Sequence, residues 1–207
     1  MTVPYPPVIL TPSSEPYRGR PVLVELDRLI CSTLELSNKI APRSHGPTLS
    51  DEQYMAGQLI AQGLSLAQSI RELIRQGHLF GGAVLVRPLM ERAVMLLYLF
   101  VFPEEIGIWN RGWNRKEAPD LARMIRRMQA KVRAGVAAND LTSALNSLTH
   151  AKPDSAQWNL VTVDSGRTLH AVSAILNRPD MCDELCKSVS PALDVIGLLM
   201  GSYFPAE

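Results

Sequence analysis

The sequence predicts an all-α protein: a single helical bundle of seven or eight helices behind a proline-rich N-terminal arm. After residue 21, apolar residues recur every three or four positions, which is the period of a helix with one buried side. Residues 1–21 contain six prolines, a density that excludes a helix over this segment. The strand-like segment Trp158–Asp164 has no evident partner strand, so we expect it to stay irregular. The chain therefore divides into an arm, residues 1–21, and a bundle domain, residues 22–207.

Three long helices are predicted in the first half of the bundle. Pro21 suits the first turn of a helix, where its missing N–H costs nothing. Ser50 and Gln53 have the spacing of a capping box, and Gly77 is a typical residue at which a helix ends. The predicted helices are Pro21–Lys39, Asp51–Gln76 and Leu79–Phe102.

The third of these helices is apolar enough to raise the question of a membrane span. Its three charges, on Arg87, Glu91 and Arg92, cost about 9 kcal/mol of insertion energy against about 7 kcal/mol gained from its apolar residues. We therefore expect that the protein has no membrane partner. The segment should instead be the central helix of a water-soluble bundle. Arg87 and Glu91 lie one turn apart and can pair. Pro88 predicts either a kink or a helix that restarts there.

The second half of the bundle is predicted to consist of shorter helices. Asp140 is a suitable cap, and Ser190 followed by Pro191 has the pattern of a cap and first turn that begin a last helix. The expected elements are a short helix from Pro103, then Ala118–Arg133, Asp140–His150, Gly166–Leu176, Asp180–Val189 and a final helix ending near Tyr203.

Composition places the chain among globular proteins of the cytoplasm. It is 46% hydrophobic and 20% charged, and its net charge of +1 gives no overall attraction to nucleic acid or anionic membranes. An odd number of cysteines without an export signal indicates reduced thiols. Cys182 and Cys186 would share one side of a helix, with His170 as the nearest further ligand. Because zinc needs more ligands than two thiols, we expect no metal and no cofactor.

Established catalytic motifs are missing from the sequence. The nearest approach to a hydrolase elbow, Gly63–Ala67, falls inside a predicted long helix, where no such turn can form. Phosphate loops, zinc-protease motifs, calcium loops and dinucleotide fingerprints are also absent. Arg71 and His78, with six residues between them, match the Arg-x(4–6)-His pattern of HEPN ribonucleases, but a chain of this composition contains about one such match by chance.

A more distinctive pattern combines the central helix with a later histidine. Residues 85–91 read LVRPLME, Tyr98 and Leu99 end an apolar run, and Leu148-Thr-His150 follows downstream. This combination resembles uncharacterised bacterial all-helical domain families whose central helix reads L-x-R-[SP]-L-x-E. Those families look like distant relatives of HEPN bundles and often occur in prokaryotic defence or toxin-like loci. The resemblance covers about residues 50–155 and implies a class of protein, with no particular reaction.

Arg87, Glu91 and His150 are the candidate catalytic residues. Around a polar pocket, the arginine would hold a phosphate and the histidine would transfer protons. In the competing interpretation, which we favour, the same three side chains form a satisfied polar network that fixes how the helices pack.

A basic stretch gives the second candidate site. Residues 111–133 contain eight basic and two acidic residues, and the apolar side of the predicted helix leaves its cations exposed. Trp109 and Trp113 would provide stacking faces for RNA bases, or would instead pack into the core while the cations are merely solvated. The candidate nucleic-acid-binding residues are Arg115, Lys116, Arg123, Arg126, Arg127 and Lys131.

Together these features favour a cytoplasmic, non-catalytic helical interaction or regulatory protein. Its expected partner is a second copy of the chain or another protein, bound through an apolar helix face or the proline-rich arm. The first alternative is a HEPN-like ribonuclease or nucleotide-binding enzyme that uses Arg87, Glu91 and His150. The second alternative is an RNA-binding module that uses the basic helix.

Overall fold

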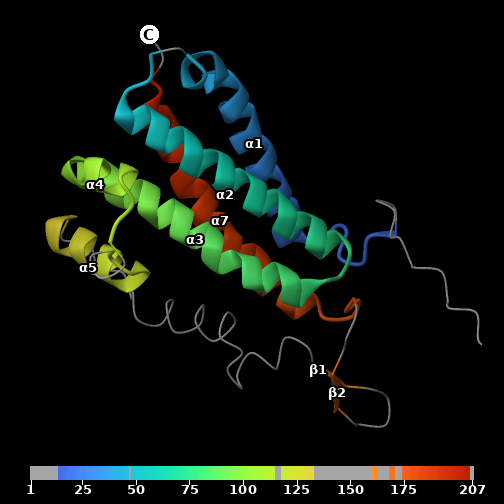
Figure 1. Cartoon of the computed structure of the whole chain (residues 1–207). Coiled ribbons are helices and arrows are strands. Elements are labelled where there is room, and N and C mark those ends of the chain that lie inside the picture. The colour runs from blue at the N-terminus through green and yellow to red at the C-terminus, as the bar shows by residue number, and fades with distance from the viewer. Residues whose placement is uncertain are drawn as a thin grey trace, which may run out of the picture.

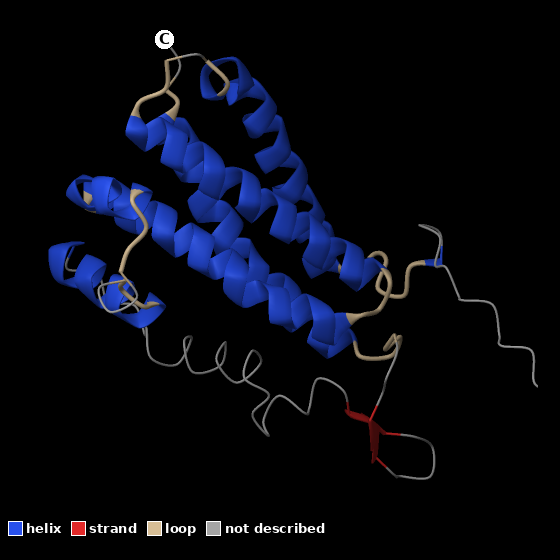
Figure 2. Ribbon diagram, in the orientation of Figure 1, coloured by secondary structure: helices blue, strands red, loops and turns tan. Residues whose placement is uncertain are grey.

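The computed structural model describes residues 14–46, 48–114, 118–132, 160–162, 168–170 and 174–205. This part of the chain is mostly helical, which confirms the all-α class (Figure 2). The arm residues before Ser14 and the helix predicted over Asp140–His150 lie outside it. The elements are α1 (Pro21–Ser44), α2 (Asp51–Arg75), α3 (Leu79–Val101), a 3-10 turn (Pro103–Glu105), α4 (Ile106–Asn110), α5 (Leu121–Val132), β1 (Leu160–Thr162), β2 (Thr168–His170) and α7 (Pro179–Tyr203).

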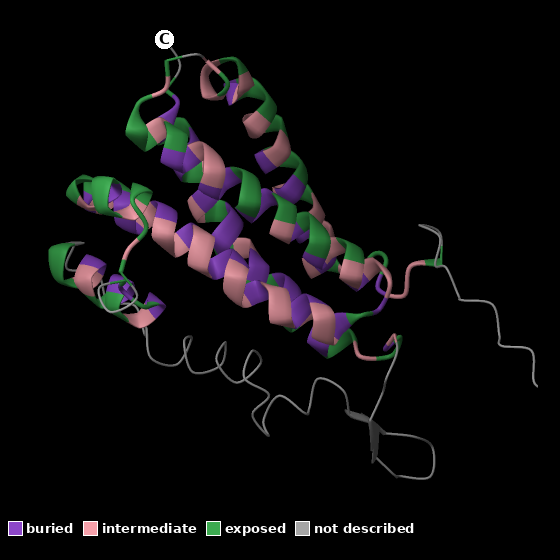
Figure 3. Ribbon diagram, in the orientation of Figure 1, coloured by how far each residue is buried: buried purple, intermediate pink, exposed green. Residues whose placement is uncertain are grey.

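The four long helices form the body of the molecule (Figure 1). α7 packs against α1, α2 and α3, while α5 packs on α3 and α4 packs on α2. Figure 3 shows the buried residues gathered on the inner sides of these helices. α3 likewise packs against α2, α5 and α7, and Phe100 is its one exposed residue, so the prediction that α3 is a central helix is confirmed. One side of α3 is buried, but the side with Arg87, Glu91 and Arg92 is half-exposed.

Local sequence signals set both ends of α2. The Ser50 hydroxyl accepts a hydrogen bond from the Gln53 N–H, and the Gln53 side chain accepts one from the Ser50 N–H, both at 3.2 Å. This is the predicted capping box. At the other end, Gly77 has a φ of +75°, a left-handed conformation that glycine adopts without strain.

Prolines end fewer helices than the sequence predicted. α1 continues to Ser44, past the predicted end at Lys39, with Pro42 in its last turns. α3 runs through Pro88 as one helix, so the predicted alternative of a restart there is wrong. In α1 the buried Ile40 holds the extra turn against the core, which offsets the hydrogen bond that Pro42 cannot make.

α7 is one continuous helix where two were predicted. Ser190 does not cap a new helix, because its hydroxyl donates to the Cys186 carbonyl oxygen at 3.1 Å within the same helix. Val189 and Ala192 are buried on either side of Pro191, so core packing continues across the proline. Among the described helices, α7 is long and apolar enough to cross a membrane, and 44% of its most apolar stretch is buried in the bundle. The core helix of a soluble protein meets the same criteria of length and composition, so this is weak evidence for a membrane span.

A short antiparallel strand pair corrects two further predictions. β1 pairs with β2 in the register Leu160↔His170, Val161↔Leu169 and Thr162↔Thr168. Part of Trp158–Asp164 is therefore a strand, and the helix predicted over Gly166–Leu176 is wrong at β2. The partner strand was missed because its few residues were assigned to a helix.

Candidate functional site

The candidate site is a half-open pocket of about 380 Å³, which we call the Arg87 pocket. It brings together three of the predicted residues, Arg87, Glu91 and Trp109. α3 contributes Arg87, Glu91 and Arg92, and the other lining residues come from α2, α4, α5 and the chain entering α5. Its lining residues are Leu59, Gln62, Arg87, Glu91, Arg92, Met95, Trp109, Pro119, Asp120, Leu121 and Met124.

Arg87 and Glu91 form the predicted ion pair. Arg87 Nε donates to Glu91 Oε1 at 2.9 Å, as the spacing of one helical turn allows. The side chains are 24% and 34% exposed, so the pair lies at the surface of the bundle and is not deeply buried as the sequence suggested. Half-exposure lowers the cost of desolvating the two charges. His150, which the sequence suggested as a further partner, lies outside the described residues.

Arg92 extends this pair into a network that joins α3 to α2. Its Nη1 lies 3.6 Å from Glu91 Oε2, on the carboxylate that Arg87 also binds. Its Nε donates to the Gln62 side-chain oxygen at 3.1 Å. The Glu91 carboxylate is therefore held between two guanidinium groups.

The charges around the pocket balance. Arg87 and Arg92 are positive, and Glu91 and Asp120 are negative. Asp120 is also committed locally, because its Oδ1 accepts the Arg123 N–H at 2.7 Å at the start of α5. The described lining therefore has no net charge, and it offers both donors and acceptors.

Apolar side chains form the rest of the wall. Leu59, Leu121 and Met124 are buried, while Met95 and Trp109 are half-buried and pack against the core. Trp109 thus shows part of its ring to the pocket from α4. Trp113 is also half-buried and packs against the core, with its ring 6.4 Å from that of Tyr98. Both tryptophans therefore contribute to core packing, and their role as stacking faces for RNA bases stays a prediction.

Two of the predicted nucleic-acid-binding residues bind the protein itself. Arg127 Nη1 donates to Glu105 Oε1 at 2.8 Å and also contacts the Tyr98 hydroxyl, which donates to the same carboxylate at 3.2 Å. Lys131 Nζ donates to the Val101 carbonyl oxygen at 2.6 Å. Burial, and next the nearby Glu105 charge, raise the pKa of Tyr98 to about 12. These contacts attach α5 to the end of α3.

The other predicted cations have different positions. Arg123 and Arg126 are exposed on α5, with Arg126 Nε donating back to the Ala122 carbonyl oxygen at 3.3 Å. Arg115, Lys116 and His150 lie outside the described residues. In the part of α5 that the structure describes, the basic face is therefore smaller than the sequence indicates.

An ionic cluster that the sequence did not reveal lies at the other end of the bundle. Arg71 pairs with Glu15 at 2.6 Å and also binds Asp27 through two nitrogens. The Glu15 side chain is only 6% exposed. His78 is exposed at the start of α3, so the HEPN-like spacing of Arg71 and His78 does not form a site in this structure. The cluster joins residues far apart in the chain, which no local pattern can indicate.

The two thiols of α7 are fully buried. Cys182 and Cys186 have no exposed surface and act as small core residues, as the sequence favoured. The hydrogen bond with Cys182, and next burial, raise the pKa of the Cys186 thiol, which keeps it protonated. Within the described ranges no three metal-binding side chains come together, so these thiols belong to no metal site there.

Comparison with known proteins does not assign a family to this fold or site. The chain matched no protein-family model, no curated protein and no solved structure. The function of the Arg87 pocket therefore has to be derived from its own residues.

Proposed function

We propose that this is a non-catalytic helical interaction protein, regulatory in role, whose Arg87 pocket receives a side chain of a protein partner. The observation that carries the proposal is the composition of the pocket. It combines Trp109, two arginines and two methionines in a half-open wall without net charge. Tryptophan, arginine and methionine are enriched at the centres of protein interfaces, and tryptophan and arginine are the commonest residues that dominate binding energy.

The charge balance favours a protein partner over a nucleic acid. A phosphate backbone is attracted by an excess of positive charge, whereas Arg87 and Arg92 already share the Glu91 carboxylate. A polypeptide offers both donors and acceptors together with apolar side chains. This mixture complements a wall built from Gln62, Glu91 and Met95.

The pairing of the charges also supports a role without turnover. A general base needs a lone pair that can reach a substrate proton. Both Glu91 oxygens face a guanidinium group, at 2.9 and 3.6 Å. Catalysis by this carboxylate would first have to break the network that joins α3 to α2.

The proposed partner is a second copy of the chain in the cytoplasm, with no membrane involved. We also propose that the complete bundle has the seven or eight helices that the sequence predicts. In a dimer, the proline-rich arm and the half-exposed side of α3 would enlarge the contact around the Arg87 pocket. This extra area matters because one pocket alone is smaller than a stable interface.

Light scattering across a concentration series tests this proposal. Arg92→Glu places a carboxylate beside Glu91, and we expect it to weaken self-association at least tenfold. Arg28→Glu is the matched control, because it makes the same charge change beside Glu25 on an exposed part of α1. Thermal unfolding of both variants checks that they remain folded. A wild-type chain that stays monomeric, or equal association of the two variants, would contradict the proposal.

The first alternative is a HEPN-like ribonuclease or nucleotide-binding enzyme, of the kind found in prokaryotic defence or toxin-like systems. It is favoured by the presence of Arg87 and Glu91 in one pocket. Incubation with labelled RNA separates it from the main proposal. Cleavage by the wild type that is lost in a folded His150→Ala variant would support the enzyme, and we expect no cleavage.

The second alternative is an RNA-binding module, favoured by the exposed Arg123 and Arg126 on α5. It requires RNA binding that weakens steeply with salt and with the loss of both arginines. Filter binding at two salt concentrations measures this. We expect binding too weak to depend on these two residues.

A further inference from the structure

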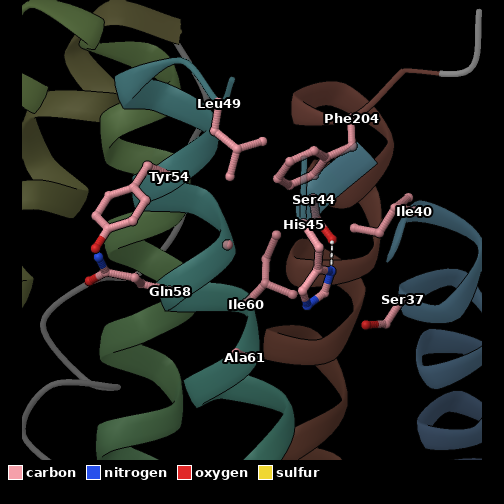
Figure 4. A pocket seen from close by; sticks show the side chains of 11 residues that line it. Ser37, Ile40, Ser44, His45, Leu49, Tyr54, Gln58, Ile60, Ala61 and Phe204 are labelled. Carbon is pink, nitrogen blue, oxygen red and sulfur yellow. Dashed lines mark hydrogen bonds between the residues drawn. The ribbon is translucent and has the colours of Figure 1, made fainter. Parts of the chain in front are cut away.

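A second cavity, of about 280 Å³, lies between the end of α1 and the first turns of α2. We call it the α1–α2 pocket. In Figure 4 the two helices lie on either side of it, and Phe204, which follows α7, lies at its upper end. It shares no lining residue with the Arg87 pocket. Its lining residues are Ser37, Ile40, Ser44, His45, Leu49, Tyr54, Gly57, Gln58, Ile60, Ala61 and Phe204.

The inner wall of this pocket is apolar and rigid. Ile40, Ile60 and Phe204 are buried core residues, so their positions are fixed by packing on both sides. Gly57 keeps the space open on the α2 side, because a Cβ added there would meet no atom within 4 Å. A glycine inside a helix costs about 1 kcal/mol relative to alanine, and here that cost coincides with an open cavity.

Polar side chains line both sides of the pocket, with His45 and two serines on the α1 side and Tyr54 and Gln58 on the α2 side (Figure 4). His45 Nδ1 lies 2.9 Å from the Ala41 carbonyl oxygen and 3.0 Å from Ser44 Oγ. Since a carbonyl oxygen only accepts hydrogen bonds, Nδ1 carries the proton in the neutral ring, and Nε2 is then an acceptor. Figure 4 shows the ring between Ile60 and Ser37, among the side chains that line the cavity.

The lining has no charged side chain among the residues that the structure describes there, in contrast to the Arg87 pocket. Burying a charged ligand against this wall would leave its charge without a partner. A cavity of about 150 Å³ holds one benzene molecule, so a cavity of 280 Å³ has room for a molecule with two fused rings. Size, shape and polarity thus define one class of ligand.

From these features we infer that the α1–α2 pocket is a binding site for a small uncharged aromatic molecule with one hydroxyl or N–H donor. The rings lie against Ile40, Ile60 and Phe204, and the donor bonds to His45 Nε2. This site is independent of the proposed interaction at the Arg87 pocket. It would give the protein a means of responding to a small molecule.

Calorimetric titration of the full chain with three probes tests the class of ligand. We expect 2-naphthol to bind with a dissociation constant in the micromolar range. Naphthalene lacks the donor and should bind about five- to tenfold more weakly, the usual net contribution of one hydrogen bond. The charged 2-naphthoate should bind at least tenfold more weakly. Equal binding of the three probes, or no binding of 2-naphthol at its solubility limit, would overturn the inference.

Two matched glycine variants locate the site. Gly57→Leu fills the cavity and also improves helix propensity, so loss of binding cannot be ascribed to unfolding. Gly197→Leu makes the same change in open space on α7, away from the lining. We expect 2-naphthol binding to be lost in the first variant and retained in the second. Binding that survives in Gly57→Leu would place the ligand elsewhere and reject the site.

A third variant tests the role of the histidine. His45→Phe keeps a ring of similar shape but removes the acceptor. We expect it to lower the affinity for 2-naphthol to that for naphthalene and to leave naphthalene binding unchanged. An unchanged preference for 2-naphthol in this variant would show that the donor does not bond to His45.

Discussion

Gly77 illustrates how a single residue can be fixed by both its backbone and its neighbours. Its φ of +75° disfavours any other residue, and an added Cβ would lie 2.9 Å from Leu176 Cδ2 and 3.1 Å from the Ile175 carbonyl oxygen. We predict that Gly77→Ala lowers the free energy of unfolding by about 2–4 kcal/mol, from backbone strain and overpacking together. Gly19→Ala is the control, because Gly19 has a similar φ of +82° in open space. Urea denaturation measures the free energy of unfolding of both variants. An equal decrease in the two would show that the contact of the added Cβ with Leu176 and Ile175 contributes nothing.

Glu72 is the residue whose titration the structure predicts most directly. Its hydrogen bonds from Arg75 and next from Gln76 lower its pKa from 4.5 to about 2. The folded state therefore favours the carboxylate, and the resulting stability is present above pH 4.5 and is lost as the pH falls toward 2. An NMR titration should show this midpoint. In Arg75→Met the midpoint should move back toward 4.5, and an unchanged midpoint would contradict the assigned cause.

The residues of the candidate sites differ in how far the sequence reveals them. Arg87 and Glu91 were predicted to pair because they lie one turn apart on one helix, a local relation. The contact of Arg71 with Glu15 joins distant segments, and only the folded chain shows it. The same limit applies to Trp109, whose place beside Arg87 depends on how α4 packs on α2.

At the scale of elements, α5 is held by cations that the sequence assigned to a partner. Arg127 bonds to Glu105 and lies over the rings of Tyr98 and Phe102, with its Cζ 5.3 and 4.8 Å from their centroids. We predict that Arg127→Ala increases amide hydrogen exchange throughout α5 about tenfold, the effect of losing roughly 1.4 kcal/mol of cation–π and ionic contacts. The neighbouring exposed Arg126→Ala should leave exchange unchanged. Equal exchange in the two variants would show that α5 is held by its apolar side alone.

Helix boundaries that depend on a local signal were predicted better than those that depend on core packing. The capping box at Ser50 and the glycine at Gly77 each act within one turn, so the sequence is sufficient to place them. Pro42 and Pro191 were expected to lie at breaks, but buried residues beside each of them keep α1 and α7 helical. The strand pair was missed for a related reason: a strand of three residues carries too short a pattern to be recognised.

At the scale of the whole molecule, the boundary between arm and bundle is earlier than the sequence suggested. Tyr17 is 2% exposed and its hydroxyl donates to the Ile175 carbonyl oxygen, Glu15 pairs with Arg71, and Arg20 pairs with Asp183 at 2.5 Å. Residues assigned to the arm are therefore part of the folded body.

Two truncations test this boundary. We predict that removal of residues 1–13 changes the free energy of unfolding by less than about 0.5 kcal/mol, because every one of these contacts is kept. Removal of residues 1–20 should lower it by about 3–5 kcal/mol, the cost of losing a buried aromatic side chain. Denaturation of the two shortened chains measures the difference. Equal free energies of unfolding for the two shortened chains would show that the bundle begins at residue 21, as the sequence predicted.

The position of α7 has a consequence for how the protein is made. α7 comes after α1, α2 and α3 in the chain, yet all three pack on it. A ribosome synthesises the chain from its N-terminus, so the first three helices emerge while their common partner is still being translated or lies in the exit tunnel. Until α7 has emerged, the sides of these three helices that pack on it lack their partner, although α2 can already pack against α1 and α3. Synthesis of α7 is therefore the step that completes the core.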